Sequence, residues 1–94
     1  MFTIVPTPEF SKDLEDFALP AITAIQNAVQ SYLRTSPHIP QGTRIKKLHH
    51  FRPPLYRLRA GDYRVYYRLQ ETQVILLAVL NRRDAERWLS KYGD

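Results

Sequence analysis

Arginines recur at alternate positions in the middle of the chain, on either side of the turn Ala60-Gly61-Asp62. Side chains of a β-strand alternate between two faces, so a hairpin over residues 55–68 would gather several arginines on one face. These are Arg57, Arg59, Arg64 and Arg68. A guanidinium group bonds phosphate through two parallel hydrogen bonds and stays charged at physiological pH. We therefore expect this face to bind nucleic-acid phosphates, with Tyr66 among the arginines to stack on a base; an ordinary solvent-facing strand pair is the alternative.

Two further arginines stand where a last helix is expected to begin. Arg82 and Arg83 follow an apolar run and precede a helical pattern, so they fall in the first turn of that helix. The positive end of a helix macrodipole disfavours cations, by about 0.3–1 kcal/mol each. A local rule broken in this way often marks a functional position, although both arginines could instead solvate the helix start. We expect Arg82 and Arg83 to border the arginine face, and Lys46 and Lys47 to extend it as RNA-binding residues.

Other chemical groups in the sequence give weaker signals. His49 and His50 lie in an expected loop, and the chain has no cysteine, so no metal-ligand spacing is present. The glycine-rich loops that bind nucleotides and the turn that carries a serine nucleophile are absent as well. The acidic residues cluster in the first expected helix, which argues against a paired-carboxylate site. We expect neither a metal nor a cofactor.

Charge is distributed unevenly along the 94 residues, whose net charge is +5. Residues 1–43 carry two bases and four acids, whereas residues 44–94 carry twelve bases and five acids. Such polarity builds a positive surface that attracts polyanions. The hydrophobic fraction of 44% is typical of a folded protein. Because the sequence has no signal peptide and no apolar run of about 18 residues, we expect a cytoplasmic protein with no membrane partner.

Hydrophobic patterning predicts the element order β-α-α-β-β-β-α. The expected strands cover residues 2–5, 55–59, 63–69 and 74–80. Thr7 and Pro8 predict the start of a helix, Pro20 ends it and opens a second helix over the region 21–34, and Asn81 precedes the last helix. The prolines and glycine of residues 36–54 predict a loop with a short ordered piece at 44–48. We expect a single α+β domain over residues 1–94, a helical hairpin packed on a mainly antiparallel four-stranded sheet.

Three segments of the sequence resemble a known family of small bacterial proteins. Residues 55–67, with the stretch Gly-Asp-Tyr-Arg-Val-Tyr-Tyr, resemble the central hairpin of RelE-type toxins from toxin–antitoxin systems. Residues 79–85 look like the final strand and basic turn of these toxins, and residues 45–48 are similar to their Lys-Lys-Leu segment. The resemblance covers nearly the whole chain and places it in the RelE/ParE superfamily, closest to the RelE-type mRNA interferases.

The resemblance implies the toxin of a type II toxin–antitoxin system, held inactive by a cognate antitoxin. Such a toxin is an endoribonuclease that enters the A site of the 30S ribosomal subunit, cleaves mRNA there and so inhibits translation. The ribose 2′-OH attacks the adjacent phosphate, which yields a cyclic phosphate and a free 5′-OH. Carried over by position, the catalytic residues would be Arg57, Arg59, Arg64 and Arg83, or Arg82 in place of the last.

The resemblance leaves the proton-transfer groups and the target open. The family's C-terminal aromatic residue is not at its usual spacing, so the candidates are Trp88, Tyr92, His49 and His50. Arginine keeps its proton in proteins, so it is a poor proton shuttle and suits electrostatic stabilisation better. ParE-type relatives share the fold and inhibit DNA gyrase, and a degenerate member would bind nucleic acid without cleaving it. The concentration of arginines on the hairpin favours RNA cleavage.

Overall fold

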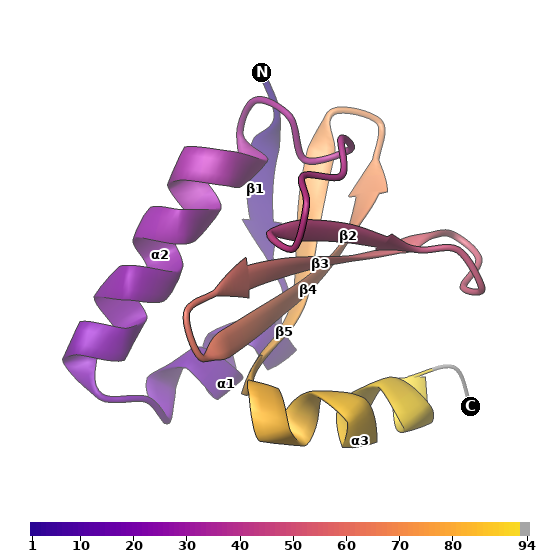
Figure 1. Ribbon diagram of the computed structural model, residues 1–94. Coiled ribbons are helices and arrows are strands. Elements are labelled where there is room, and N and C mark those ends of the chain that lie inside the picture. The colour runs from indigo at the N-terminus through magenta and orange to yellow at the C-terminus, as the bar shows by residue number, and fades with distance from the viewer. Residues whose placement is uncertain (93–94) are drawn as a thin grey trace.

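The computed structural model describes residues 1–92 of the chain. The elements along it are β1 (Thr3–Pro6), α1 (Pro8–Glu15), α2 (Leu19–Leu33), β2 (Ile45–Leu48), β3 (Leu55–Ala60), β4 (Tyr63–Gln70), β5 (Gln73–Asn81) and α3 (Arg82–Tyr92). The strands form one sheet in the order β1-β5-β4-β3-β2, with β1 parallel to β5 and the other neighbouring pairs antiparallel. Helices α1 and α2 pack on one face of the sheet and α3 on the other (Figure 1). The expected α+β class is confirmed.

The first helix begins at the residues that the sequence indicates, but it ends at Glu15 instead of at Pro20, and the second helix begins at Leu19. The hydroxyl oxygen of Thr7 accepts a hydrogen bond from the Phe10 N–H at 3.2 Å, and the same hydroxyl donates to the Leu76 carbonyl of β5 at 2.8 Å. Pro8 and Pro20 each occupy the first turn of a helix, where the N–H that proline lacks would have no partner. The cap at Thr7 therefore starts α1 and also joins it to the sheet.

The sheet contains a fifth strand, so the expectation of four strands was wrong. Strand β2 pairs with β3 at the edge of the sheet, where Ile45 lies opposite Leu58 and both side chains are fully buried. The sequence Ile-Lys-Lys-Leu does not alternate clearly between apolar and polar residues, and the neighbouring prolines and glycine favour a loop. Burial of the Ile45 side chain contributes about 1.5–3 kcal/mol and helps to hold the segment as a strand. Ile45 is buried against residues far along the sequence, so local patterning does not reveal this contribution.

Strands β3 and β4 form the expected hairpin around Gly61. Its φ of +61° is a conformation that glycine adopts without steric cost. The register places Arg57 opposite Tyr66 and Arg59 opposite Arg64. The alternate side chains on both strands join the core beneath α1 and α2. The arginines therefore project from the opposite face, on which α3 lies, as strand alternation predicts.

Strand β5 lies in the interior of the sheet, between β1 and β4, as its continuous apolar run predicts. Its pairing with β1 ends at Leu76, and α1 packs beside β5 beyond this point. There the Asp13 carboxylate accepts a hydrogen bond from the Val79 N–H at 3.4 Å. Burial raises the pKa of Asp13, and the bond from Val79 lowers it by less. Helix α1 thus covers a strand edge that would otherwise be open.

Candidate nucleic-acid interface

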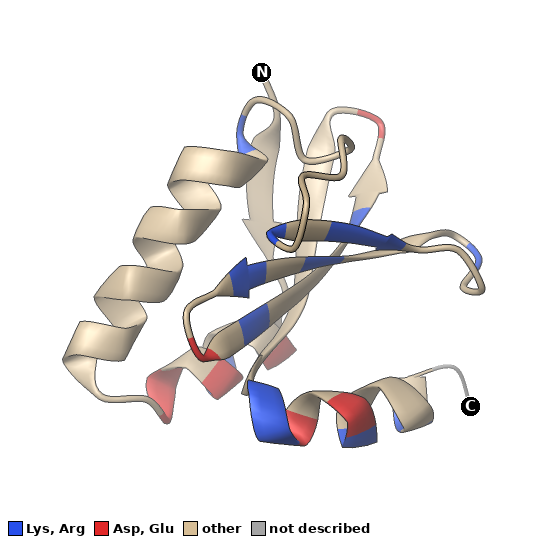
Figure 2. Cartoon of the chain, viewed as in Figure 1, with Lys and Arg blue, Asp and Glu red and all other residues tan. Residues whose placement is uncertain are grey.

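A groove of about 540 Å³ lies on the α3 face of the sheet, between strands β2 to β4 and the first turns of α3. Its charged lining residues are Lys46, Arg57, Arg64, Arg82, Arg83 and Glu86. Leu48, Ala85 and Leu89 contribute apolar surface to the same groove. Figure 2 shows the basic segments of β2, β3 and β4 side by side, with the basic start of α3 below them. This excess of positive charge in a concave surface attracts anions.

Arg57 is held by the loop that precedes β2. Its Nη2 donates to the Thr43 carbonyl at 3.1 Å, whereas its Nε is buried and has no hydrogen-bond partner in the described part of the chain. A buried donor without an acceptor costs free energy, roughly 1–3 kcal/mol.

Arg64 folds back onto the hairpin turn. Its Nη1 donates to the carbonyls of Gly61 and Tyr63, at 2.9 Å each. Burial, followed by the neighbouring charges of Arg59 and Arg57, lowers the pKa of Arg64. The guanidinium remains charged at neutral pH, and its other N–H groups remain available to an anion.

Arg82 and Arg83 lie in the first turn of α3, as predicted, and both line the groove. The backbone N–H of Arg82 donates to the Asp62 carbonyl in the hairpin turn at 2.9 Å. The hairpin therefore fixes where α3 starts, and with it the position of both arginines relative to Arg57 and Arg64. The helix N-terminus adds its own partial positive charge to the groove.

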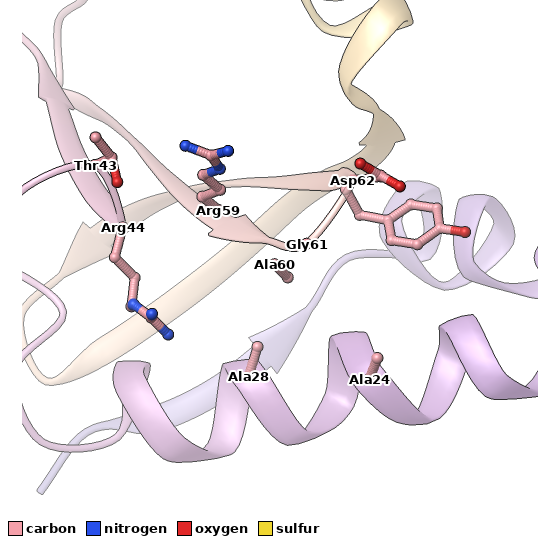
Figure 3. Close-up of a pocket in the computed structure, with 9 residues that line it drawn as sticks. Ala24, Ala28, Thr43, Arg44, Arg59, Ala60, Gly61 and Asp62 are labelled. Atoms are coloured by element: carbon pink, nitrogen blue, oxygen red, sulfur yellow. The ribbon is translucent and has the colours of Figure 1, made fainter.

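Arg59 lies outside the groove, although it was expected to act with Arg57 and Arg64. It lines a different depression, of about 400 Å³, between α2 and the hairpin turn. Figure 3 shows the Arg44 side chain directed toward α2 and the Arg59 side chain directed away from it. The Arg44 guanidinium lies 4.4 Å from the centroid of the Tyr32 ring. Arg59 therefore occupies the end of the hairpin, beside the groove.

Two other residues expected to bind RNA are also separated from the groove. The Nζ of Lys47 lies 5.9 Å from the centroid of the Tyr56 ring, on the sheet face that α1 and α2 cover. Consecutive residues of a strand point to opposite faces, so Lys46 and Lys47 cannot both enter the groove. Arg68 shares the face of Arg64 but pairs with Ile75, farther along the sheet.

The aromatic ring of Tyr66 is covered by α3. Only 1% of Tyr66 is exposed, and its ring stacks on Trp88 with centroids 4.8 Å apart. Trp88 in turn stacks on Tyr92 at 4.8 Å. Burial raises the pKa of the Tyr66 phenol, although Arg57 and Arg64 lower it. Tyr66 therefore holds α3 against the sheet in this conformation, where its ring face is not open to a base.

The candidate proton-transfer groups named from the sequence do not line the groove. Trp88 lines a separate depression, with Asp84 among its neighbours. Tyr92 is 38% exposed near the end of α3, and its ring lies 5.7 Å from that of Phe51. His49 and His50 are exposed in the loop between β2 and β3.

Glu86 is the charged groove residue that the sequence pattern did not indicate. It follows Arg82 and Arg83 by four and three positions on α3, and Leu89 follows it by three. This spacing places all four residues on one side of a helix. The signal was therefore present in the sequence, but it becomes informative only when the groove side of α3 is known.

Residues 1–92 contain no cluster of three or more His, Cys, Asp or Glu side chains that could hold a metal ion. Within the same range, no helix has the length and apolar character needed to cross a membrane.

The five-stranded sheet with helices on both faces and a cationic groove beside α3 defines a RelE-like α+β protein. The sequence model of one family, described as ParE toxin of type II toxin–antitoxin system, parDE, matches residues 4–86. The chain therefore belongs to this toxin family, within the RelE/ParE superfamily that the hairpin sequence predicted. A comparison with curated protein sequences found no match.

Solved structures share the fold. A chain of the RelBE2 toxin–antitoxin complex from Mycobacterium tuberculosis is 24% identical, with a TM-score of 0.73 over 86% of this chain and 98% of that one. A chain of the RelE–RelB complex from Pyrococcus horikoshii is 22% identical, with a TM-score of 0.70 over 86% and 94%. The RelB–RelE complex from Methanococcus jannaschii gives 21% identity and a TM-score of 0.70 over 89% and 96%.

Proposed function

We propose that this toxin is a ribosome-dependent endoribonuclease that cleaves mRNA in the A site. The observation that carries the proposal is the groove itself, in which cations from three strands and one helix line a single concave surface. Cations held this close repel one another unless an anion lies between them. The backbone of a single-stranded RNA supplies that anion at regular intervals.

The groove arginines would act on the phosphate at which the chain is cut. The ribose 2′-oxygen attacks phosphorus, the bond from phosphorus to the 5′-oxygen breaks, and negative charge builds on the phosphate oxygens. In this proposal Arg57, Arg64 and Arg83, which line the groove together with Arg82, would stabilise this charge. Arg59, at the end of the hairpin, would contact a flanking phosphate. The ribosome would supply the alignment of the 2′-OH, a contribution that can lower the barrier by several kcal/mol.

We propose a cognate antitoxin as the protein partner. Solved structures with this fold include toxin–antitoxin complexes, and the groove would favour an acidic segment of such a partner. An acidic segment bound there would supply anions to the same arginines and exclude RNA by competition.

Inhibition of DNA gyrase is the second candidate function. The specific observation in its favour is the match to the ParE family model over residues 4–86. A gyrase inhibitor would not need cations converging on one phosphate. The groove therefore favours RNA cleavage.

The test is a reconstituted translation reaction with the purified toxin, in which mRNA 5′ ends are mapped by primer extension. A gyrase supercoiling assay runs in parallel. We expect cuts at codon-spaced positions that require ribosomes and disappear in the Arg64→Ala/Arg83→Ala variant. The matched control is Arg87→Ala, because Arg87 is exposed, pairs with Asp84 at 3.2 Å and lies outside the groove. Intact mRNA together with blocked supercoiling would overturn the nuclease proposal.

A further inference from the structure

We propose that Glu86 is the general base that removes the proton from the attacking 2′-OH. This inference rests on the proposed nuclease function and names a residue that acts in it. The starting observation is that, among residues 1–92, Glu86 is the one carboxylate that lines the cationic groove.

Glu86 lines the same groove as the groups proposed to hold the phosphate. On α3 it is one helical turn beyond Arg82 and Arg83, on the side that faces the hairpin. Its charge acts on the Tyr66 phenol in the floor of the groove, as do the charges of Arg57 and Arg64. The groove that the exposed Glu86 lines thus also contains cations from β2, β3, β4 and the start of α3, together with one buried phenol.

The Glu86 carboxylate is not held in an ion pair. Within residues 1–92, the ion pair of α3 joins Arg87 to Asp84 at 3.2 Å, on the side away from the groove. A carboxylate without a fixed partner keeps its lone pairs available to accept a proton. If Glu86 served only to neutralise a neighbouring arginine, a close pair with Arg82 or Arg83 would be expected.

The other ionisable groups of the groove are poor proton acceptors. Lys46 and the arginines carry their protons at neutral pH. The Tyr66 phenol is buried, and burial raises its pKa. Tyr92, His49 and His50 do not line the groove. Glu86 is therefore the lining residue whose side chain is chemically suited to accept a proton.

In the proposed step Glu86 accepts one proton, and solvent water supplies the proton that the leaving 5′-oxygen needs. Glu86 takes the 2′-OH proton as the 2′-oxygen bonds to phosphorus, and the bond from phosphorus to the 5′-oxygen breaks. The departing 5′-oxygen takes a proton from solvent water, and Glu86 later releases its proton to solvent. The products are a 2′,3′-cyclic phosphate and a 5′-OH, with no change in oxidation state.

The test compares Glu86→Gln with wild-type toxin in single-turnover cleavage on programmed ribosomes. Loss of a general base lowers the rate by about 10²–10⁴-fold. Glutamine preserves shape and removes a negative charge, so the variant should bind ribosomes and RNA at least as tightly as wild type while its cleavage rate falls. Glu86→Asp should recover part of the rate, and the decline of the wild-type rate at acid pH should be absent from Glu86→Gln. Asp84→Asn, on the same helix outside the groove, is the matched control.

Three outcomes would overturn the base assignment, and one of them would also overturn the proposed nuclease function. If wild type cleaves mRNA and Glu86→Gln cleaves at the same rate, the base assignment is wrong and the proposed nuclease function stands. If binding weakens as much as cleavage, Glu86 is a binding residue and the base assignment again fails. If wild type itself leaves mRNA intact, the proposed function fails, and the base assignment fails with it.

Discussion

Replacing Arg83 with alanine should remove one phosphate contact and so reduce the salt dependence of RNA binding by the contribution of that contact. Lys46 and four arginines line the groove, and each phosphate neutralised on a single strand contributes about 0.7 to the slope of log K against log[salt]. If all of these cations contact phosphate, the wild-type slope is about −3.5, and binding weakens roughly 130-fold between about 50 and 200 mM salt. Without Arg83 the slope becomes about −2.8, and the same change weakens binding roughly 50-fold.

The assay is fluorescence anisotropy with a short labelled single-stranded RNA, titrated at several salt concentrations. An RNA with 2′-O-methyl groups lacks the attacking hydroxyl, so cleavage cannot affect the binding curves. Arg87→Ala is the matched control, because it removes an equal charge from the same helix but outside the groove. An unchanged slope for Arg83→Ala would refute the reasoning, and so would an equal decrease in both variants.

The remaining predictions concern stability. Burial raises the pKa of Asp13 in the folded protein above its ordinary value. The protonated Asp13 side chain therefore contributes fully to the free energy of unfolding below the ordinary pKa, and this contribution is lost as the pH rises through the folded-state pKa. Asp13→Asn should abolish this fall while keeping an acceptor for the Val79 N–H, and thermal unfolding across the acidic range checks it; an unchanged pH profile would contradict it. Gly61→Ala should lose roughly 1–2 kcal/mol in urea denaturation, because the φ of +61° strains any residue with a Cβ; wild-type stability would refute this. Tyr67→Phe should lose about 0.5–1.5 kcal/mol, since the buried Tyr67 hydroxyl donates to the Pro37 carbonyl at 2.7 Å; an unchanged midpoint would show that water replaces the bond.

Features set by neighbouring residues were predictable from the sequence. Thr7 and Pro8 start a helix through a cap and a fixed φ, and Gly61 supplies the turn that only glycine adopts freely. Strand alternation then placed Arg57 and Arg64 on one face without any knowledge of the tertiary structure.

Features that depend on distant contacts were not predictable in the same way. Strand β2 exists because Ile45 is buried in a core built from other elements. Tyr66 was expected to meet a base, but Trp88, more than twenty positions along the chain, covers its ring. The orientation of α3 also decides that Glu86, rather than Asp84, enters the groove.

The stack of Trp88 between Tyr66 and Tyr92 gives the protein an intrinsic fluorescent probe of the position of α3. Trp88 is the single tryptophan of the sequence, and both of its ring neighbours have centroids 4.8 Å from it. The fluorescence emission of an indole ring depends on nearby rings and on water. The emission of Trp88 therefore reports, without a label, whether α3 is packed on the sheet. A partner that lifts the helix from the sheet would shift the emission, whereas one that fills the groove and leaves the stack intact would not. The two modes of engagement can therefore be told apart in the unmodified protein.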